Sequence, residues 1–179
     1  MGKKIIAVAV LGVLAGCATT VETQYFTLDM RDADPGEPAA AVRVDRIIVA
    51  EPLSRKDILI QKTPTEVEYY ATAQWAAGID DLVTEKLEAE FGHMPLDADP
   101  FLLSGVLYQF EQVDVGGGAE AHAQLDVELR TERYGDPVFE KTYTERMAAG
   151  AAAPGPVVQA LSRCVERIAA RVLEDAAAL

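Results

Sequence analysis

The sequence is poor in the side chains that usually carry metal-dependent or nucleophilic chemistry. Among 179 residues there are two cysteines, two histidines and three serines. Neither His93 nor His122 has the HExxH spacing or a similar one, and no serine stands in a G-x-S-x-G elbow. We therefore expect no catalytic residue, no metal and no cofactor; an enzyme is not excluded on these grounds, but nothing in the residues argues for one.

Positive charge and long apolar runs are also scarce. The 16 Lys and Arg residues face 29 Asp and Glu residues, which gives a net charge of −13. Such a chain repels phosphate backbones, so we expect no nucleic acid partner. Only one apolar run, near the start, approaches membrane length, which excludes a polytopic membrane protein. Because 50% of the residues are hydrophobic, the chain is too apolar for a disordered polymer and suits one globular domain.

Residues 1–16 are typical of a secretory signal peptide. Lys3 and Lys4 form a basic region, and the uncharged apolar stretch at 5–15 is too short to remain as a membrane span. The letters LAGC at 14–17 resemble a bacterial lipobox. The resemblance implies diacylglycerol on the sulfur of Cys17, cleavage before it, and acylation (palmitate) of the new amino terminus. The alternative is an ordinary signal peptide whose mature part begins near a cysteine.

The lipobox predicts how the chain is divided and where it resides. We expect a lipidated tether at 17–23 and a single domain at 24–179. Two or more acyl chains anchor a protein stably, so the membrane is an expected partner through the lipid. Ala18 follows the cysteine where an Asp would favour the inner membrane, which favours the periplasmic face of the outer membrane. Cys164 then has no intramolecular partner, and its role stays open.

Hydrophobic periodicity predicts an α+β fold. Apolar residues alternate with polar ones most clearly at 119–130, where Asp126, Glu128 and Arg130 share the polar face. Helical spacing of apolar residues predicts helices at 75–91 and 157–173. Further strands are expected at 25–28, 42–50, 57–61, 65–70, 101–115 and 138–147. We predict an antiparallel β-sheet with two amphipathic helices packed on one face, as a two-layer sandwich.

The densest aromatic group consists of Tyr69, Tyr70 and Trp75, and it includes the only tryptophan. Aromatic side chains suit a hydrophobic core, which is the role we favour. They are also enriched at the centres of protein interfaces, which makes them candidate partner-binding residues.

Four segments resemble the ABC-type transport auxiliary lipoprotein family, the PqiC-like proteins. The family's "YYTL" strand is matched by YFTL at 25–28, and its "V-x-V-x-x-V-x-(L/V)-P" strand by VRVDRIIV at 42–49 with a displaced Pro52. Its "LDR-x-x-I-V" element resembles LSRKDILI at 53–60, and its "Y…WA…L…L" pattern is echoed over 69–87.

Two departures weaken the transfer of individual residues. Ser54 replaces the Asp of "LDR", and the "WAEPL" sequence reads WAAGI from Trp75 onward. Arg55 keeps the family's arginine and joins Tyr69, Tyr70 and Trp75 as a candidate partner-binding residue.

The resemblance implies a non-catalytic subunit of an MCE-type envelope lipid transport system. The expected partners are an MCE-domain protein and an ABC permease, which the lipoprotein would dock at the outer membrane as a monomer or as a homo-oligomer. One alternative is a periplasmic lipid carrier with an apolar groove between helices and sheet. Others are an outer-membrane assembly lipoprotein without an ABC transporter and, far less favoured, an envelope hydrolase using Ser104 or His122.

Overall fold

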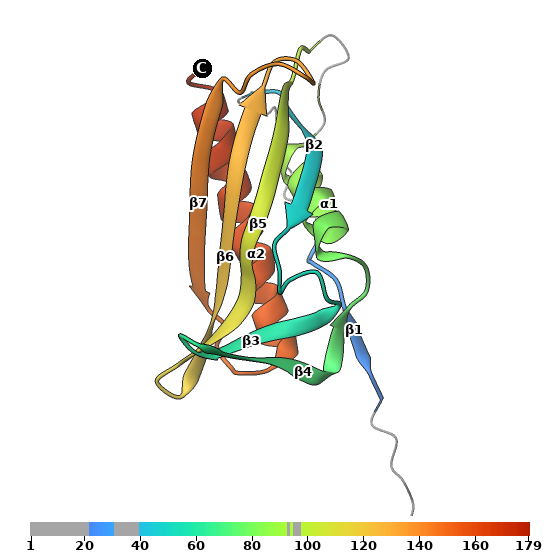
Figure 1. Ribbon diagram of the computed structural model, residues 1–179, viewed down its shortest axis with the longest axis vertical. Helices are drawn as coiled ribbons and strands as arrows, with labels where there is room; N and C mark the ends of the chain where they lie inside the picture. Colours follow the sequence, from blue (N-terminus) through green and yellow to red (C-terminus); the bar gives the residue numbers. More distant parts are fainter. Residues whose placement is uncertain (1–21, 31–39, 93, 95–97) are drawn as a thin grey trace, which may run out of the picture.

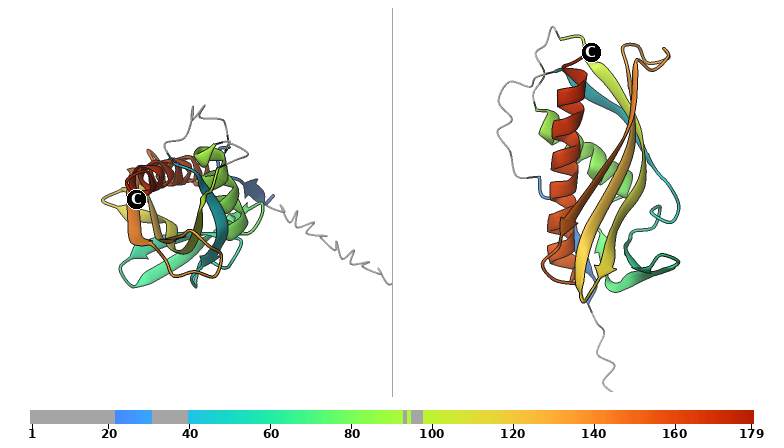
Figure 2. Two further views of the ribbon diagram at one scale, coloured as in Figure 1. Left: turned by 90° about the horizontal axis from the view of Figure 1, so that it is seen from above. Right: turned by 90° about the vertical axis from the view of Figure 1, so that its left-hand side faces the viewer.

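The computed structural model describes residues 22–30, 40–92, 94 and 98–179. Its elements are β1 (Gln24–Phe26), β2 (Val42–Val49), β3 (Asp57–Thr63), β4 (Glu66–Trp75), α1 (Ile79–Phe91), β5 (Phe101–Val115), β6 (Gly118–Arg130), β7 (Phe139–Ala148) and α2 (Pro154–Ala176) (Figure 1). The predicted signal peptide and Cys17 lie outside the described residues. The predicted α+β class is confirmed, with both helices on one side of the sheet (Figure 2).

Strand β5 is the centre of the sheet. One of its edges pairs with β6 in antiparallel fashion from Leu102 to Val115. Its other edge is shared, because β2 pairs with the first half of β5 and β3 with the second half. The strand order is β1-β4-β3-β5-β6-β7, with β2 attached to β5. Strands β5, β6 and β7 thus form an antiparallel meander.

The sheet is mixed, so the expectation of a purely antiparallel sheet was wrong. The pairs β1 with β4, β2 with β5, and β3 with β5 are parallel. Parallel neighbours need a long crossover connection, and α1 supplies part of the one that returns the chain from β2 to β5. An alternating sequence reports which face of a strand is buried and carries no information about the direction of its neighbour.

The first helix begins later than its apolar spacing predicts. Trp75 is the last residue of β4, and its backbone N–H donates to the carbonyl oxygen of Lys56 at 2.7 Å. The helix starts only at Ile79, after this pairing has ended. The indole is completely buried and packs on the ring of Phe110, with centroids 5.5 Å apart. Trp75 therefore packs in the hydrophobic core as a residue of strand β4 and not of helix α1.

The long helix α2 covers β5, β6 and β7 with a continuous apolar stripe. Its buried residues include Val157, Leu161, Cys164, Val165, Ile168 and Val172. On the sheet side, Leu103, Leu125 and Val127 are equally buried, so side chains fill the space between the two layers. Burial raises the pKa of the Cys164 thiol to about 12, which keeps it protonated at neutral pH.

Close approach of β5 and β6 requires glycine at position 105. A Cβ atom on Gly105 would lie 2.8 Å from the backbone oxygen of Asp126 and 3.1 Å from methyl groups of Ile47 and Leu125. We expect Gly105→Ala to lower the free energy of unfolding by about 1–3 kcal/mol, because the two strands must separate. Urea unfolding measures this. Gly155→Ala in α2, whose Cβ would meet nothing within 4 Å, is the control and should be neutral or slightly stabilising.

Candidate functional site

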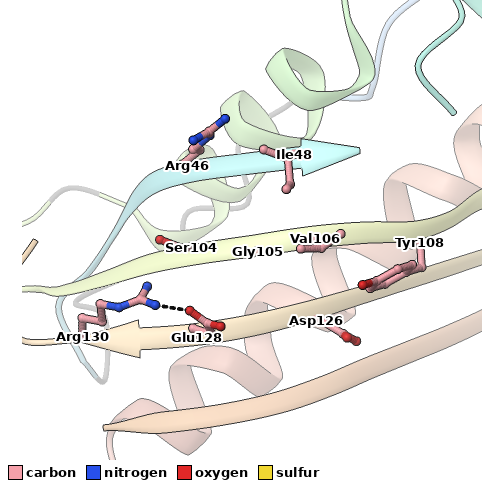
Figure 3. A pocket seen from close by; sticks show the side chains of 9 residues that line it. All are labelled: Arg46, Ile48, Ser104, Gly105, Val106, Tyr108, Asp126, Glu128 and Arg130. Carbon is pink, nitrogen blue, oxygen red and sulfur yellow. Dashed lines mark hydrogen bonds and ion pairs between the residues drawn. The ribbon is translucent and has the colours of Figure 1, made fainter. Parts of the chain in front are cut away.

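A groove of about 460 Å³ lies on the face of the sheet that the helices leave uncovered (Figure 3). Its floor is β5, and its two sides are β2 and β6. Strand pairing sets these side chains in rows, because Ile48 is opposite Val106, which is opposite Asp126. In the neighbouring row, Arg46 is opposite Ser104. The groove therefore follows from strand register and the period of two.

The connection between β6 and β7 reaches over the beginning of β5 toward β2. Arg133 forms an ion pair of 3.2 Å with Asp45 of β2. Asp45 lies where a bulge shifts the register between Val44 and Arg46. Arg130 donates from Nε to the carbonyl oxygen of Gly135 at 3.1 Å, which fixes the same connection. These contacts join β2 and β6 and hold the two sides of the groove in place.

The groove combines charged and apolar groups. Glu128 and Arg130 neutralise each other in an ion pair (Figure 3). The Oδ1 atom of Asp126 is buried and meets no hydrogen-bond donor in the described part of the protein. Ile48 and Tyr108 are 42% and 48% exposed, which is high for such large apolar side chains. This is an amphipathic surface of the kind that binds another molecule.

Two of the predicted partner-binding residues come together on another surface. The guanidinium of Arg55 lies 4.3 Å from the centre of the Tyr69 ring, in a cation–π contact. Arg55 also pairs with Asp57 at 3.1 Å, and the hydroxyl of Tyr69 donates to the carbonyl oxygen of Pro52 at 3.3 Å. Partner binding by these two residues stays a prediction.

The other two predicted residues serve the interior more than the surface. The hydroxyl of Tyr70 donates to Oε1 of Gln112, and burial raises the pKa of Tyr70. Trp75 has no exposed surface, so in this structure it offers nothing to a partner. The four residues thus do not form one contiguous site.

The groups considered for catalysis are far apart. Ser104 pairs across the strands with Glu128, whereas His122 pairs with Glu111. Six strand positions separate His122 from Glu128, which corresponds to about 20 Å. His122 instead contacts Glu120, with Nε2 2.9 Å from Oε2. His93 lies outside the described residues.

Within the described ranges, no three His, Cys, Asp or Glu side chains gather as a metal site would require. Neither α1 nor α2 has the combined length and hydropathy of a membrane-spanning helix.

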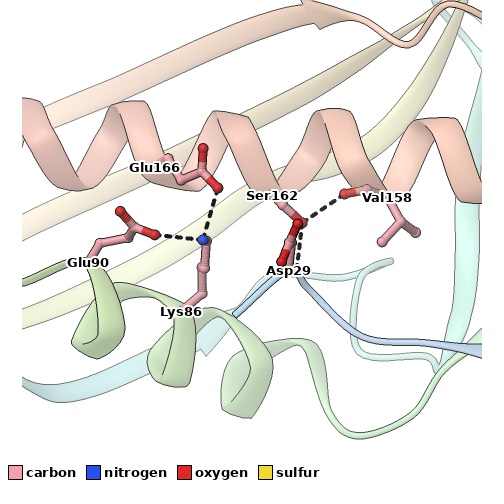
Figure 4. A network of polar contacts seen from close by, with 6 residues as sticks. All are labelled: Asp29, Lys86, Glu90, Val158, Ser162 and Glu166. Atoms are coloured by element: carbon pink, nitrogen blue, oxygen red, sulfur yellow. Dashed lines mark hydrogen bonds and ion pairs between the residues drawn. The ribbon is translucent and has the colours of Figure 1, made fainter. Parts of the chain in front are cut away.

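A charge cluster centred on a buried lysine joins the two helices (Figure 4). Lys86 of α1 is only 1% exposed, and its Nζ lies 2.6 Å from Glu90 and 2.9 Å from Glu166 of α2. Burial opposes the charge, but hydrogen bonds to the two carboxylates outweigh it and raise the pKa of Lys86. The cluster fixes the helices that back the sheet.

The segment after β1 is fastened to α2 beside this cluster. The backbone N–H of Asp29 donates to Oγ of Ser162 at 3.0 Å, and Ser162 donates to the carbonyl oxygen of Val158 at 2.9 Å (Figure 4). Leu28, next to Asp29, is buried in the core. The beginning of the described chain is therefore part of the folded body.

Sequence patterns indicated part of the groove. The alternation at 119–130 placed Asp126, Glu128 and Arg130 on one face, which the structure confirms. It gave no sign that Arg46 and Ile48 would lie across from them, because that depends on the parallel pairing of β2 with β5.

Comparisons with known proteins agree with the predicted resemblance. Residues 26–100 match the family described as the ABC-type transport auxiliary lipoprotein component, so the resemblance is confirmed over this segment. A solved structure of an uncharacterized protein is 12% identical in sequence and has a TM-score of 0.65. The match covers 87% of this chain and 99% of the chain of that protein. A Xanthomonas campestris protein of the DUF330 family is 18% identical, with a TM-score of 0.70 and coverages of 83% and 92%. At these identities both structures show the fold alone. No curated protein sequence matches the chain.

Proposed function

From the match of residues 26–100 to an ABC-type transport auxiliary lipoprotein component, we propose that this protein is a non-catalytic subunit of an MCE-type lipid transport system. It is anchored by lipid on Cys17 to the periplasmic face of the outer membrane. There it docks an MCE-domain protein and, through it, the ABC permease. The family match is the observation that carries the proposal.

The position of the tether supports a docking role. Six residues lie between Cys17 and Gln24, the first residue of β1, so an extended chain places the two at most about 25 Å apart. The chain enters the fold at the end of the molecule where β1, β3 and β4 lie, whereas β2, which borders the groove, lies in the other half (Figure 1). A lipid on Cys17 would hold the end formed by β1, β3 and β4 near the membrane. The groove would then remain open to the periplasm, and anchoring would raise the local concentration of the partner.

The packing of the interior is less favourable to a lipid carrier. Such a carrier would need an apolar space between helices and sheet. In the described part of the chain, Leu103, Leu125 and Leu161 meet there and are at most 1% exposed. We therefore prefer docking to carriage.

The decisive experiment is affinity purification of the full-length, acylated protein from cross-linked membranes, followed by mass spectrometry. We expect an MCE-domain protein or an ABC permease to be recovered. The Cys17→Ser variant, which cannot be lipidated, should leave the membrane fraction and recover at least about tenfold less of the partner. Recovery of outer-membrane assembly proteins alone, or of no protein, would contradict the proposed function.

A further inference from the structure

We propose that the groove over β2, β5 and β6 binds an extended segment of a partner protein that inserts a lysine or arginine side chain against Asp126. Apolar side chains of the same segment pack on Ile48 and Tyr108. The inference rests on the proposed docking function and specifies the surface and the chemistry of the partner.

Asp126 supplies the argument from charge. Its Oδ1 atom is buried without a donor in the described structure, and an unsatisfied buried acceptor costs free energy. The neighbouring carboxylate, Glu128, already has a cation in Arg130. A cationic side chain seated in the groove against the Asp126 carboxylate would pair its charge in a strong, charge-assisted interaction. The net charge of −13 favours the approach of such a segment.

Tyr108 supplies the argument from shape. The register of β5 against β6 shifts between Leu107 and Gln109, which makes Tyr108 the additional residue of a β-bulge. Bulges redirect side chains and are frequent beside functional sites. Here the side chain of Tyr108 is 48% exposed and lines the groove together with Ile48. Exposed aromatic side chains beside apolar ones are typical of interface centres.

The composition of the groove favours a peptide over a lipid acyl chain. Arg46 lies on one side of the groove, and Asp126, Glu128 and Arg130 lie on the other. An acyl chain placed between them would remove the charges of Arg46 and Asp126 from water without pairing them, which is costly. A peptide brings both apolar and charged groups, and a volume of about 460 Å³ accommodates a few of its side chains.

Photo-cross-linking in intact cells tests the occupant. The full-length protein would carry p-benzoylphenylalanine in place of Tyr108, and the cross-linked material would be analysed by mass spectrometry. We expect a cross-link to a defined segment of an envelope protein that contains a lysine or arginine. Cross-links to phospholipid alone, or the lack of any cross-link, would overturn the proposal.

A titration then tests the role of Asp126. A synthetic peptide copying the cross-linked segment should bind the purified protein, and Asp126→Asn should weaken binding about tenfold or more. The matched control is Glu174→Gln, an equivalent change at an exposed site on α2, which should leave the affinity unchanged. A second peptide would carry norleucine in place of the cationic residue. Its affinity for the wild-type protein should be about as low as the affinity of the original peptide for the Asp126→Asn protein. Equal affinity of wild type and Asp126→Asn would overturn the proposal.

The two proposals fail in different ways. A basic segment from a protein outside any transport system would uphold the groove and contradict the transport function. Recovery of a permease or MCE-domain protein without a cross-link from position 108 would uphold the function and overturn the groove.

Discussion

Replacing Lys86 with methionine should lower the free energy of unfolding by about 1.5–3 kcal/mol at neutral pH. The ammonium group is almost completely buried between α1 and α2, where it contacts Glu90 at 2.6 Å and Glu166 at 2.9 Å. Without it, two carboxylates face each other at the helix interface with no cation between them. Their repulsion and their lost hydrogen bonds account for the expected effect. Urea unfolding followed by circular dichroism measures it.

An exposed lysine provides the control for this experiment. Lys62 forms an ion pair with Asp114 at 2.6 Å, but its side chain is 37% exposed. Lys62→Met should have a much smaller effect than Lys86→Met, because water screens the pair. Adding Glu90→Gln and Glu166→Gln to Lys86→Met should recover part of the lost stability. Equal effects of Lys86→Met and Lys62→Met would show that the buried cluster contributes no more than a surface pair.

Local patterns in the sequence predicted the central strands well. The alternation of apolar and polar residues depends only on which face of the strand itself is buried. The strand expected at 101–115 is β5 with the same bounds, and the one expected at 119–130 is β6 with one additional residue. Trp75 was misplaced because a large apolar residue at helical spacing from Ile79 satisfies the helix pattern equally well. Its backbone hydrogen bond to Lys56, a contact between distant segments, decides in favour of the strand.

Features that depend on two distant elements could not be predicted in this way. Glu166 lies outside the apolar stripe of α2, and nothing in its own sequence neighbourhood indicates that it meets Lys86 of α1. The groove has the same character, because Ile48 and Asp126 share it only through their separate pairings with Val106. Periodicity identifies the faces of an element, whereas tertiary packing decides which faces meet.

A buried carboxylate on β5 should make the stability of the protein fall as the pH rises. Glu111 is only 5% exposed, and burial raises its pKa to about 7, although a hydrogen bond from the backbone N–H of Phe110 opposes the shift. Between the unfolded value of about 4.5 and pH 7, the folded protein holds a proton that the unfolded chain releases. The contribution of Glu111 to stability is therefore fully present below pH 4.5 and decreases by about 3 kcal/mol as the pH rises through 7.

The isosteric variant Glu111→Gln isolates this contribution. It should match wild type within about 1 kcal/mol at pH 4.5 and exceed it by about 3 kcal/mol at pH 8, because the amide never has to be buried as a charge. The other titratable groups, including His122 opposite Glu111 on β6, are the same in both proteins. Subtracting the two curves of unfolding free energy against pH therefore removes most of their effect. A difference that stays constant from pH 4.5 to 8 would show that Glu111 titrates as it does in water. A difference that grows from pH 4.5 to 8 would show that Glu111 is buried in its protonated form and loses this proton only near pH 7.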